Sequence, residues 1–168
     1  MPLIGILSPM KISVILAALS FVISAAHEIY QFFEESTDGR TTTRLGLLEN
    51  KNIPGRYWLQ ANAQTHDVFY FDESGIVKWG PGEDRGKRLF AHVSGQSSNL
   101  GLYFALAQEP DQNSSDFAEF EGPIGKYYLN YGSQAVFKTC NGGIIYITSS
   151  QTRCLSLKIK VVFIDTRN

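Results

Sequence analysis

Histidine and carboxylate side chains are the groups in this sequence that could carry out acid–base chemistry. His66 and His92 are candidate proton donors and acceptors, and Glu119 is a candidate carboxylate partner, which is the set that a small ribonuclease-like hydrolase needs. Their surroundings favour ordinary structural positions. His66 precedes Asp67 in a polar stretch typical of an exposed turn, and His92 lies in the apolar run 89–93, typical of packing. We therefore expect no catalytic residue and keep the hydrolase as the alternative.

Nucleophilic, metal and phosphate-binding motifs are incomplete. Residues 95–101 lack the Gly-x-Ser-x-Gly spacing of a nucleophile elbow. The 2 cysteines are too few for a zinc site, and no two histidines stand at i and i+4. Residues 80–88 resemble a phosphate loop, but Pro81 stands where a glycine is needed and Arg88 replaces the Ser/Thr that would hold magnesium. We expect neither a metal nor a cofactor.

Aromatic residues make up 12% of the chain and offer a binding alternative to catalysis. Tyr57, Trp58 and Trp79 stand in strand-like runs, where exposed rings could stack on sugars or contact a protein. Because successive side chains of a strand point to opposite faces, about half of such rings must face a core. These three residues are the candidate binding residues, with core packing as the competing interpretation.

Short aromatic and β-branched runs separated by Gly, Asn, Asp and Pro would position these groups on strands. The predicted strands cover residues 56–60, 68–71, 76–79, 89–93, 100–106, 126–131, 135–140, 144–148 and 155–163. Gly75 and Asn141-Gly142 supply hairpin turns, whereas residues 29–33 fit a strand or a short helix equally well. The chain is thus predicted to be all-β or mainly β, a small antiparallel β-sandwich or barrel with one disulfide.

The last predicted strand has the strictest alternation. Its apolar side chains share one face, and they are Leu155, Leu157, Ile159, Val161 and Phe163. Lys158 belongs to the opposite, polar face. We therefore expect Leu155→Asp to unfold the domain and Lys158→Asp to be nearly silent.

The N-terminal residues have the pattern of a secretory signal peptide. Starting from Met10, Lys11 is followed by the apolar run 12–23 and by small residues up to Ala26, where cleavage is expected. A membrane anchor is the alternative, but Pro9 and Lys11 interrupt the apolar stretch and no basic cluster follows it. We expect a signal peptide at 1–26, with its start at Met10, and no membrane association after cleavage.

Residues 27–168 are of a length suited to one domain, and we expect a single secreted, extracellular β-rich domain. The formal net charge of the chain is −1, and loss of Lys11 would make it one unit more negative, so nucleic acid is not expected as a partner. Export to an oxidising compartment predicts a disulfide between Cys140 and Cys154. Asn113 is a candidate glycosylation site, and Lys87-Arg88 is a candidate dibasic processing site.

The C-terminal half resembles an uncharacterised family of small secreted proteins of filamentous ascomycete fungi. The resemblance lies in residues 116–120, in 125–130 and in the strands that carry the two cysteines, ending at 155–159 and 161–164. That family tends to carry a His-Thr-Gly-Ala-Gly stretch, whereas residues 63–67 here read Ala-Gln-Thr-His-Asp. The resemblance implies a fungal extracellular protein that meets a host plant, and it implies no activity.

Together these patterns favour a secreted, non-enzymatic fungal protein that acts by binding. It would be an effector or elicitor candidate, and its partner would be a host protein or a cell-wall polysaccharide. The alternative is a small secreted hydrolase, ribonuclease-like, that uses His66 or His92 with a carboxylate.

Overall fold

The computed structural model is nearly all β. It describes residues 26–61, 64–73, 75–80, 88–106, 116–122, 125–140 and 142–167. Strands make up 67% of the described residues, which contain no helix, so the predicted fold class is confirmed. The strands are β1 (His27–Ser36), β2 (Thr42–Glu49), β3 (Tyr57–Ala61), β4 (Phe69–Asp72), β5 (Gly75–Lys78), β6 (Leu89–Gln96), β7 (Asn99–Leu106), β8 (Phe117–Glu121), β9 (Tyr127–Tyr131), β10 (Phe137–Cys140), β11 (Ile144–Ser149) and β12 (Leu155–Arg167).

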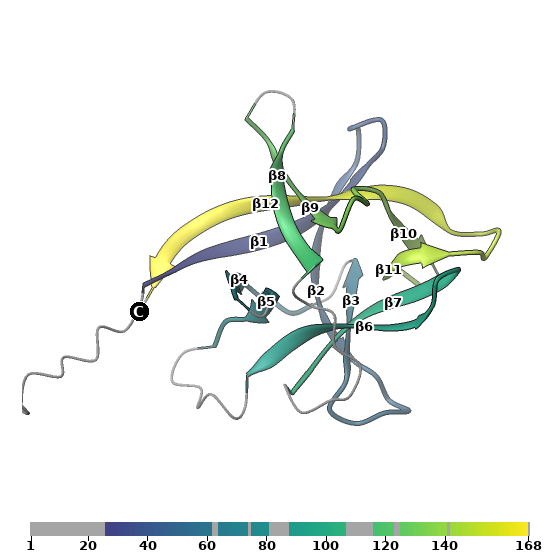
Figure 1. Ribbon diagram of the computed structural model, residues 1–168, viewed down its shortest axis with the longest axis horizontal. Helices are drawn as coiled ribbons and strands as arrows, with labels where there is room; N and C mark the ends of the chain where they lie inside the picture. Colours follow the sequence, from purple (N-terminus) through teal and green to yellow (C-terminus); the bar gives the residue numbers. More distant parts are fainter. Residues whose placement is uncertain are drawn as a thin grey trace, which may run out of the picture.

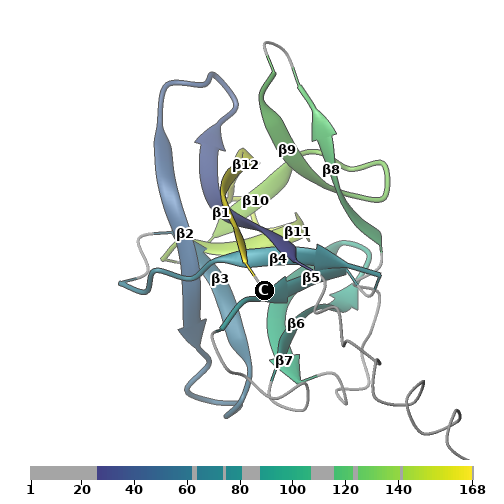
Figure 2. The same ribbon diagram turned by 90° about the vertical axis from the view of Figure 1, so that its left-hand side faces the viewer.

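Nine strands close into an antiparallel barrel. Hydrogen-bonded neighbours follow the order β1-β4-β5-β6-β7-β3-β11-β10-β12, and pairing of β12 with β1 closes the ring (Figure 1). The other strands are attached to this ring: β2 pairs with both β1 and β3, β9 pairs with β12, and β8 pairs with β9. The β8–β9 hairpin and the turn between β1 and β2 project from the same side of the barrel (Figures 1 and 2).

The closing pair of strands is the longest in the molecule. Register runs from His27↔Arg167 to Ser36↔Leu157 and shifts once, between Ile29 and Tyr30. Residues 29–33, which fitted a strand or a helix, are therefore strand. Tyr30 and Phe32 face the barrel core, whereas Ile29, on the opposite face of β1, packs in a second cluster.

The alternation of β12 is confirmed in its middle and fails at its ends. Leu157, Ile159 and Val161 are buried in the barrel core. Leu155 is 70% exposed and Phe163 is 54% exposed, so the expectation that Leu155→Asp unfolds the domain is wrong. Alternation defines a face, but the core covers only part of that face because β12 extends beyond the barrel interior.

A second, smaller core lies on the outer face of the β4–β5 hairpin. Ile29, Tyr70 and Val77 are buried there, with Trp79 and Phe90 packed against them. Phe69 and Ile76, on the inner face of the same hairpin, belong to the barrel core. Gly75 has φ 108°, the left-handed conformation expected for its turn. Since both of its faces are packed, the hairpin holds Trp79 and Gly80, which follow β5, in a fixed position.

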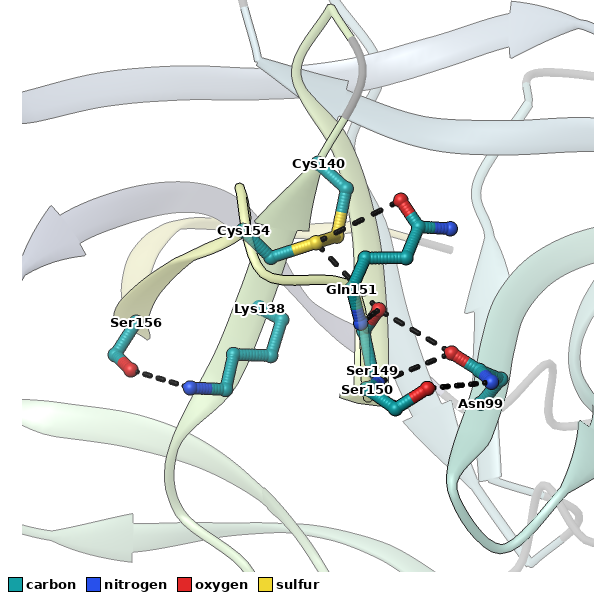
Figure 3. Close-up of a disulfide and its surroundings, with 8 residues drawn as sticks. All are labelled: Asn99, Lys138, Cys140, Ser149, Ser150, Gln151, Cys154 and Ser156. Carbon is teal, nitrogen blue, oxygen red and sulfur yellow. Dashed lines mark hydrogen bonds between the residues drawn. A yellow bond between two sulfur atoms is a disulfide. The ribbon is translucent and has the colours of Figure 1, made fainter.

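The predicted disulfide is present (Figure 3). Cys140 ends β10 and Cys154 immediately precedes β12, and the two Cα atoms are 4.5 Å apart. These strands also pair, since Thr139 lies opposite Leu155. The bond therefore holds the segment between the two cysteines, which contains β11, against the start of β12.

Side chains tie the same segment to β7. Asn99 Oδ1 accepts from the backbone N–H of Ser150 at 3.1 Å, and Asn99 Nδ2 donates to Ser150 Oγ at 3.0 Å (Figure 3). Beside this contact, Ser149 Oγ lies 3.4 Å from Cys154 Sγ. The disulfide is thus part of a larger polar cluster that holds the barrel closed near β11.

Several sequence predictions fall outside the described residues. These are the signal peptide with its start at Met10, Asn113 as a glycan acceptor, and Lys87 of the dibasic pair. Within the part of the chain that the structure describes, no helix is long and apolar enough to cross a bilayer.

Candidate binding cleft

A cleft of about 480 Å³ opens beside the end of the β1–β12 pair that carries Arg167. Its lining comes from β1, β2, β12, the segment before β4, and the end of β5. The lining residues are Gln31, Arg44, His66, Asp67, Val68, Lys78, Trp79, Gly80, Ile164 and Arg167. We call this site the cation cleft, because three of these side chains are Arg or Lys.

Strand register explains why residues so distant in sequence meet here. Tyr30 of β1 pairs with Phe69 of β4, and Phe69 pairs in turn with Lys78 of β5. A further backbone hydrogen bond, from Trp79 N to Val68 O at 2.9 Å, continues the hairpin past the last strand pair. On the other side, β1 pairs with β2, which places Arg44 opposite Phe33.

Arg44 is held by two neutral side chains. Its Nη1 donates to Nδ1 of His66 at 2.6 Å. With the Gln31 amide turned so that its oxygen faces the guanidinium, which is the orientation that satisfies both groups, Gln31 accepts a second bond from Arg44. Because a guanidinium only donates, His66 must accept at Nδ1 and carry its proton on Nε2. Arg44 forms no ion pair among the described residues. Its charge is thus positioned but not neutralised.

Asp67 is already engaged by the protein. Its Oδ2 accepts from the backbone N–H of Leu47 at 2.8 Å, and its Oδ1 lies 3.9 Å from Lys78 Nζ. Thr65 Oγ1 also lies 3.2 Å from the N and O atoms of Leu47. These bonds fasten the segment before β4 to β2, and they turn the carboxylate toward β2 and Lys78.

Arg167 is held by an aromatic ring. Its guanidinium carbon lies 4.7 Å from the centroid of Trp79, and its Nε lies 3.4 Å from Asp165 Oδ2. Trp79 also packs against the second core, so the ring supports Arg167 from a fixed position. Val68 and Ile164 complete an apolar wall beside it.

The cleft is locally positive in a chain of net charge −1. Arg44, Lys78 and Arg167 contribute three positive charges, and Asp67 in the lining and Asp165 beside Arg167 contribute two negative charges, which leaves +1 when His66 is neutral. Cations gathered in one hollow raise the local positive potential that an anion meets. The arrangement is suited to binding an anion.

The three candidate catalytic residues are not brought together. His92 is 1% exposed, stacks on Tyr103 with ring centroids 5.3 Å apart, and has Nε2 3.3 Å from the Ala105 carbonyl oxygen. Glu119, on β8, lies 3.4 Å from the Tyr30 hydroxyl, and burial raises the pKa of its carboxyl. Only His66 lines the cleft.

The three candidate binding aromatics are also separated. Tyr57 packs against the barrel core and lines a neighbouring hollow of about 480 Å³ that shares Asp67 and Lys78 with the cation cleft. Trp58 points to the other face of β3, where its ring lies 6.1 Å from that of Tyr103. Trp79 alone lines the cation cleft, so the three rings form no common surface.

Sequence reasoning missed most of the cleft. Gln31, Arg44, Lys78 and Arg167 were not candidates, because single charged or amide residues on strands give no motif. Arg44 lies on β2, a strand that was not predicted. The positions that did stand out were His66 and Trp79, selected for residue type rather than for their proximity.

Comparisons of the chain with protein-family models, with curated proteins and with solved structures find no match. Within the described ranges, no group of three or more His, Cys, Asp or Glu side chains gathers as a metal site would require.

Proposed function

We propose that the protein is a secreted, non-enzymatic binding protein of fungal origin, an effector or elicitor candidate, and that the cation cleft is its binding site. The observation that carries this proposal is the state of Arg44, which is oriented by His66 and Gln31 and has no carboxylate partner among the described residues. A charge held in place by neutral groups favours an external anion as its counterion. Of the two expected partner classes, a cell-wall polysaccharide with acidic groups fits this chemistry.

Two contacts support binding over hydrolysis. The Nδ1 lone pair of His66 is used by Arg44, and Nε2 carries a proton, so the ring in this state has no lone pair with which to accept another. Asp67, the carboxylate that follows His66 directly in the sequence, already accepts from Leu47 N and lies close to Lys78. A general base is therefore not prepared in the cleft.

The hydrolase remains a second candidate because His66, Arg44 and Lys78 do line one cleft. A phosphodiester bound to Arg44 could draw the guanidinium away from His66 and free Nδ1 as a base. A ribonuclease-like activity would then depend on His66.

The chemistry of the chain supports secretion. The signal-peptide pattern at 1–26 directs export, and a disulfide between Cys140 and Cys154 is typical of proteins in oxidising compartments. The proposal thus places the cation cleft outside the cell, in contact with host material.

Retention on plant cell-wall material tests the proposal. The full chain is expressed with its leader, recovered, and compared with the R44Q/R167Q double variant, which removes two cleft cations. A K51Q/R153Q variant is the control, because both residues are exposed on turns and the charge change is the same. We expect the cleft variant alone to lose retention. Cleavage of RNA by the wild type, abolished by H66Q, would replace the binding proposal with the hydrolase.

A further inference from the structure

The positive groups of the cation cleft are arranged as two guanidinium forks from different parts of the barrel. Arg44 is near the start of β2, and Arg167 ends β12. Arg44 is held by the neutral side chain of His66, whereas Arg167 is held by the ring of Trp79 and by Asp165. A planar guanidinium fixed in this way presents paired N–H donors that match the two oxygens of a carboxylate. The site therefore offers directional recognition in addition to charge.

The cleft also has an apolar wall. Val68, Trp79 and Ile164 line it beside the cations, and Ile164 is 39% exposed. The outer face of Trp79 is covered by Arg167, so the wall offers aliphatic and ring-edge contacts rather than an open stacking platform. A volume of about 480 Å³ lies in the range of small-ligand sites. These features fit a compact ring that carries a negative group.

The charge distribution argues against a nucleic acid as the ligand. Recognition of a phosphate backbone needs a basic stripe that tracks many phosphates. Here the excess is +1 at one cleft, while the chain as a whole carries −1. Asp67 lies within the lining, and Asp165 lies beside Arg167. A polyanion would meet these carboxylates, whereas a single acidic ring can sit between the guanidinium groups.

We propose that the cation cleft binds a uronic acid unit, the carboxylated sugar ring of an acidic cell-wall polysaccharide. The inference rests on the proposed function and names its ligand class. The carboxylate is bound by Arg44, whose guanidinium is oriented by Nδ1 of His66. The ring lies along Val68 and Ile164, and Arg167 accommodates the carboxylate of the next unit along the chain.

Calorimetry with a galacturonic acid trimer tests this assignment, and its fully methyl-esterified form is the matched neutral probe. We expect the acid to bind and the ester to bind at least about tenfold more weakly, since each esterified carboxylate loses a charge-assisted hydrogen bond to an arginine. R44Q and R167Q should each weaken binding of the acid by a similar factor. R153Q, which removes an exposed charge outside the cleft, should not change it.

Other results would overturn the assignment. Equal binding of acid and ester, or equal weakening by R153Q, would show that the carboxylate is not recognised in the cleft. Inorganic phosphate that competes at the affinity of the trimer would reduce the cleft to a general anion site. If the trimer does not bind but cell-wall retention still depends on Arg44 and Arg167, the proposed function is kept and the assignment of a uronic acid as the ligand is rejected. RNA cleavage that depends on His66 would overturn both.

Discussion

Arg44 and His66 lie 22 positions apart in the chain, and a 2.6 Å hydrogen bond from Nη1 to Nδ1 joins them. The bond connects β2 to the segment before β4 without using a charge of opposite sign. Because His66 orients the guanidinium of Arg44, loss of the bond should affect anion binding more than the stability of the fold.

The first prediction separates these consequences. H66F removes the acceptor for Arg44 and leaves its charge in place, so we expect anion binding by the cleft to weaken while the free energy of unfolding changes by less than about 1 kcal/mol, because the ring is exposed. H66N, which can still accept, should retain more binding than H66F. Titration with the galacturonic acid trimer and chemical denaturation measure the two quantities. A loss of stability as large as the loss of binding would mean that the bond is mainly structural.

The second prediction concerns the boundary of the core on β12, which lies between two leucines on the same strand face. Leu157 is 3% exposed and Leu155 is 70% exposed. L157D should destabilise by more than about 4 kcal/mol because it buries an unpaired charge, whereas L155D should stay within about 0.5 kcal/mol. Thermal melts of both proteins provide the comparison. Equal melting temperatures would contradict the placement of the core boundary between these residues.

The third prediction concerns a close approach between Gly122 and Tyr128. A Cβ at position 122 would lie 2.5 Å from Cε2 of the Tyr128 ring, whose hydroxyl donates to Glu35 Oε1 at 2.8 Å. G122A should therefore displace the ring, break this bond and cost about 1–3 kcal/mol. Y128F removes the bond without the clash. If both changes act through the same contact, the double variant loses less stability than the sum of the single variants.

The fourth prediction concerns the pH dependence of stability. Burial raises the pKa of the Glu34 carboxyl above its ordinary value of 4.5, and this exceeds the opposing effect of a hydrogen bond to Thr43. The folded protein therefore holds this proton more tightly than the unfolded chain, so the contribution of Glu34 to stability rises as pH falls through the folded pKa toward 4.5.

Comparison with E34Q measures this contribution, because glutamine stays neutral. We expect E34Q to be more stable than wild type at neutral pH and the difference to shrink as the solution becomes acidic. Denaturation midpoints at a series of pH values would show it. A difference that is constant with pH would mean that Glu34 has the same pKa in both states.

Strands with strong local patterns were predictable from sequence. The hairpin at Gly75 and the middle of β12 are confirmed because turn chemistry and alternation are local properties. β2 was missed because its alternation is weak: Leu45, Gly46 and Leu47 are buried in succession. The extent of the β12 core was also missed, because burial at Leu155 depends on which elements cover it.

The cleft was less predictable than the fold. His66 was identified by residue type, but its partner Arg44 lies on β2, and Arg167 reaches the site only because β12 returns beside β1. Such a site is assembled by register between distant strands. No short window of sequence contains it, and residue types alone led instead to His92, which the fold buries.

The seam between β1 and β12 joins the first described strand to the last, with His27 opposite Arg167. Because these two strands are far apart in sequence, the edge of β1 that pairs with β12 stays unpaired during folding until β12 is available, so closure of the barrel depends on a long-range pairing. In the finished fold the two ends of the domain lie next to each other. A circularly permuted chain, with residues 27 and 167 linked and new termini at an exposed turn, should therefore reach the same barrel by a different order of assembly.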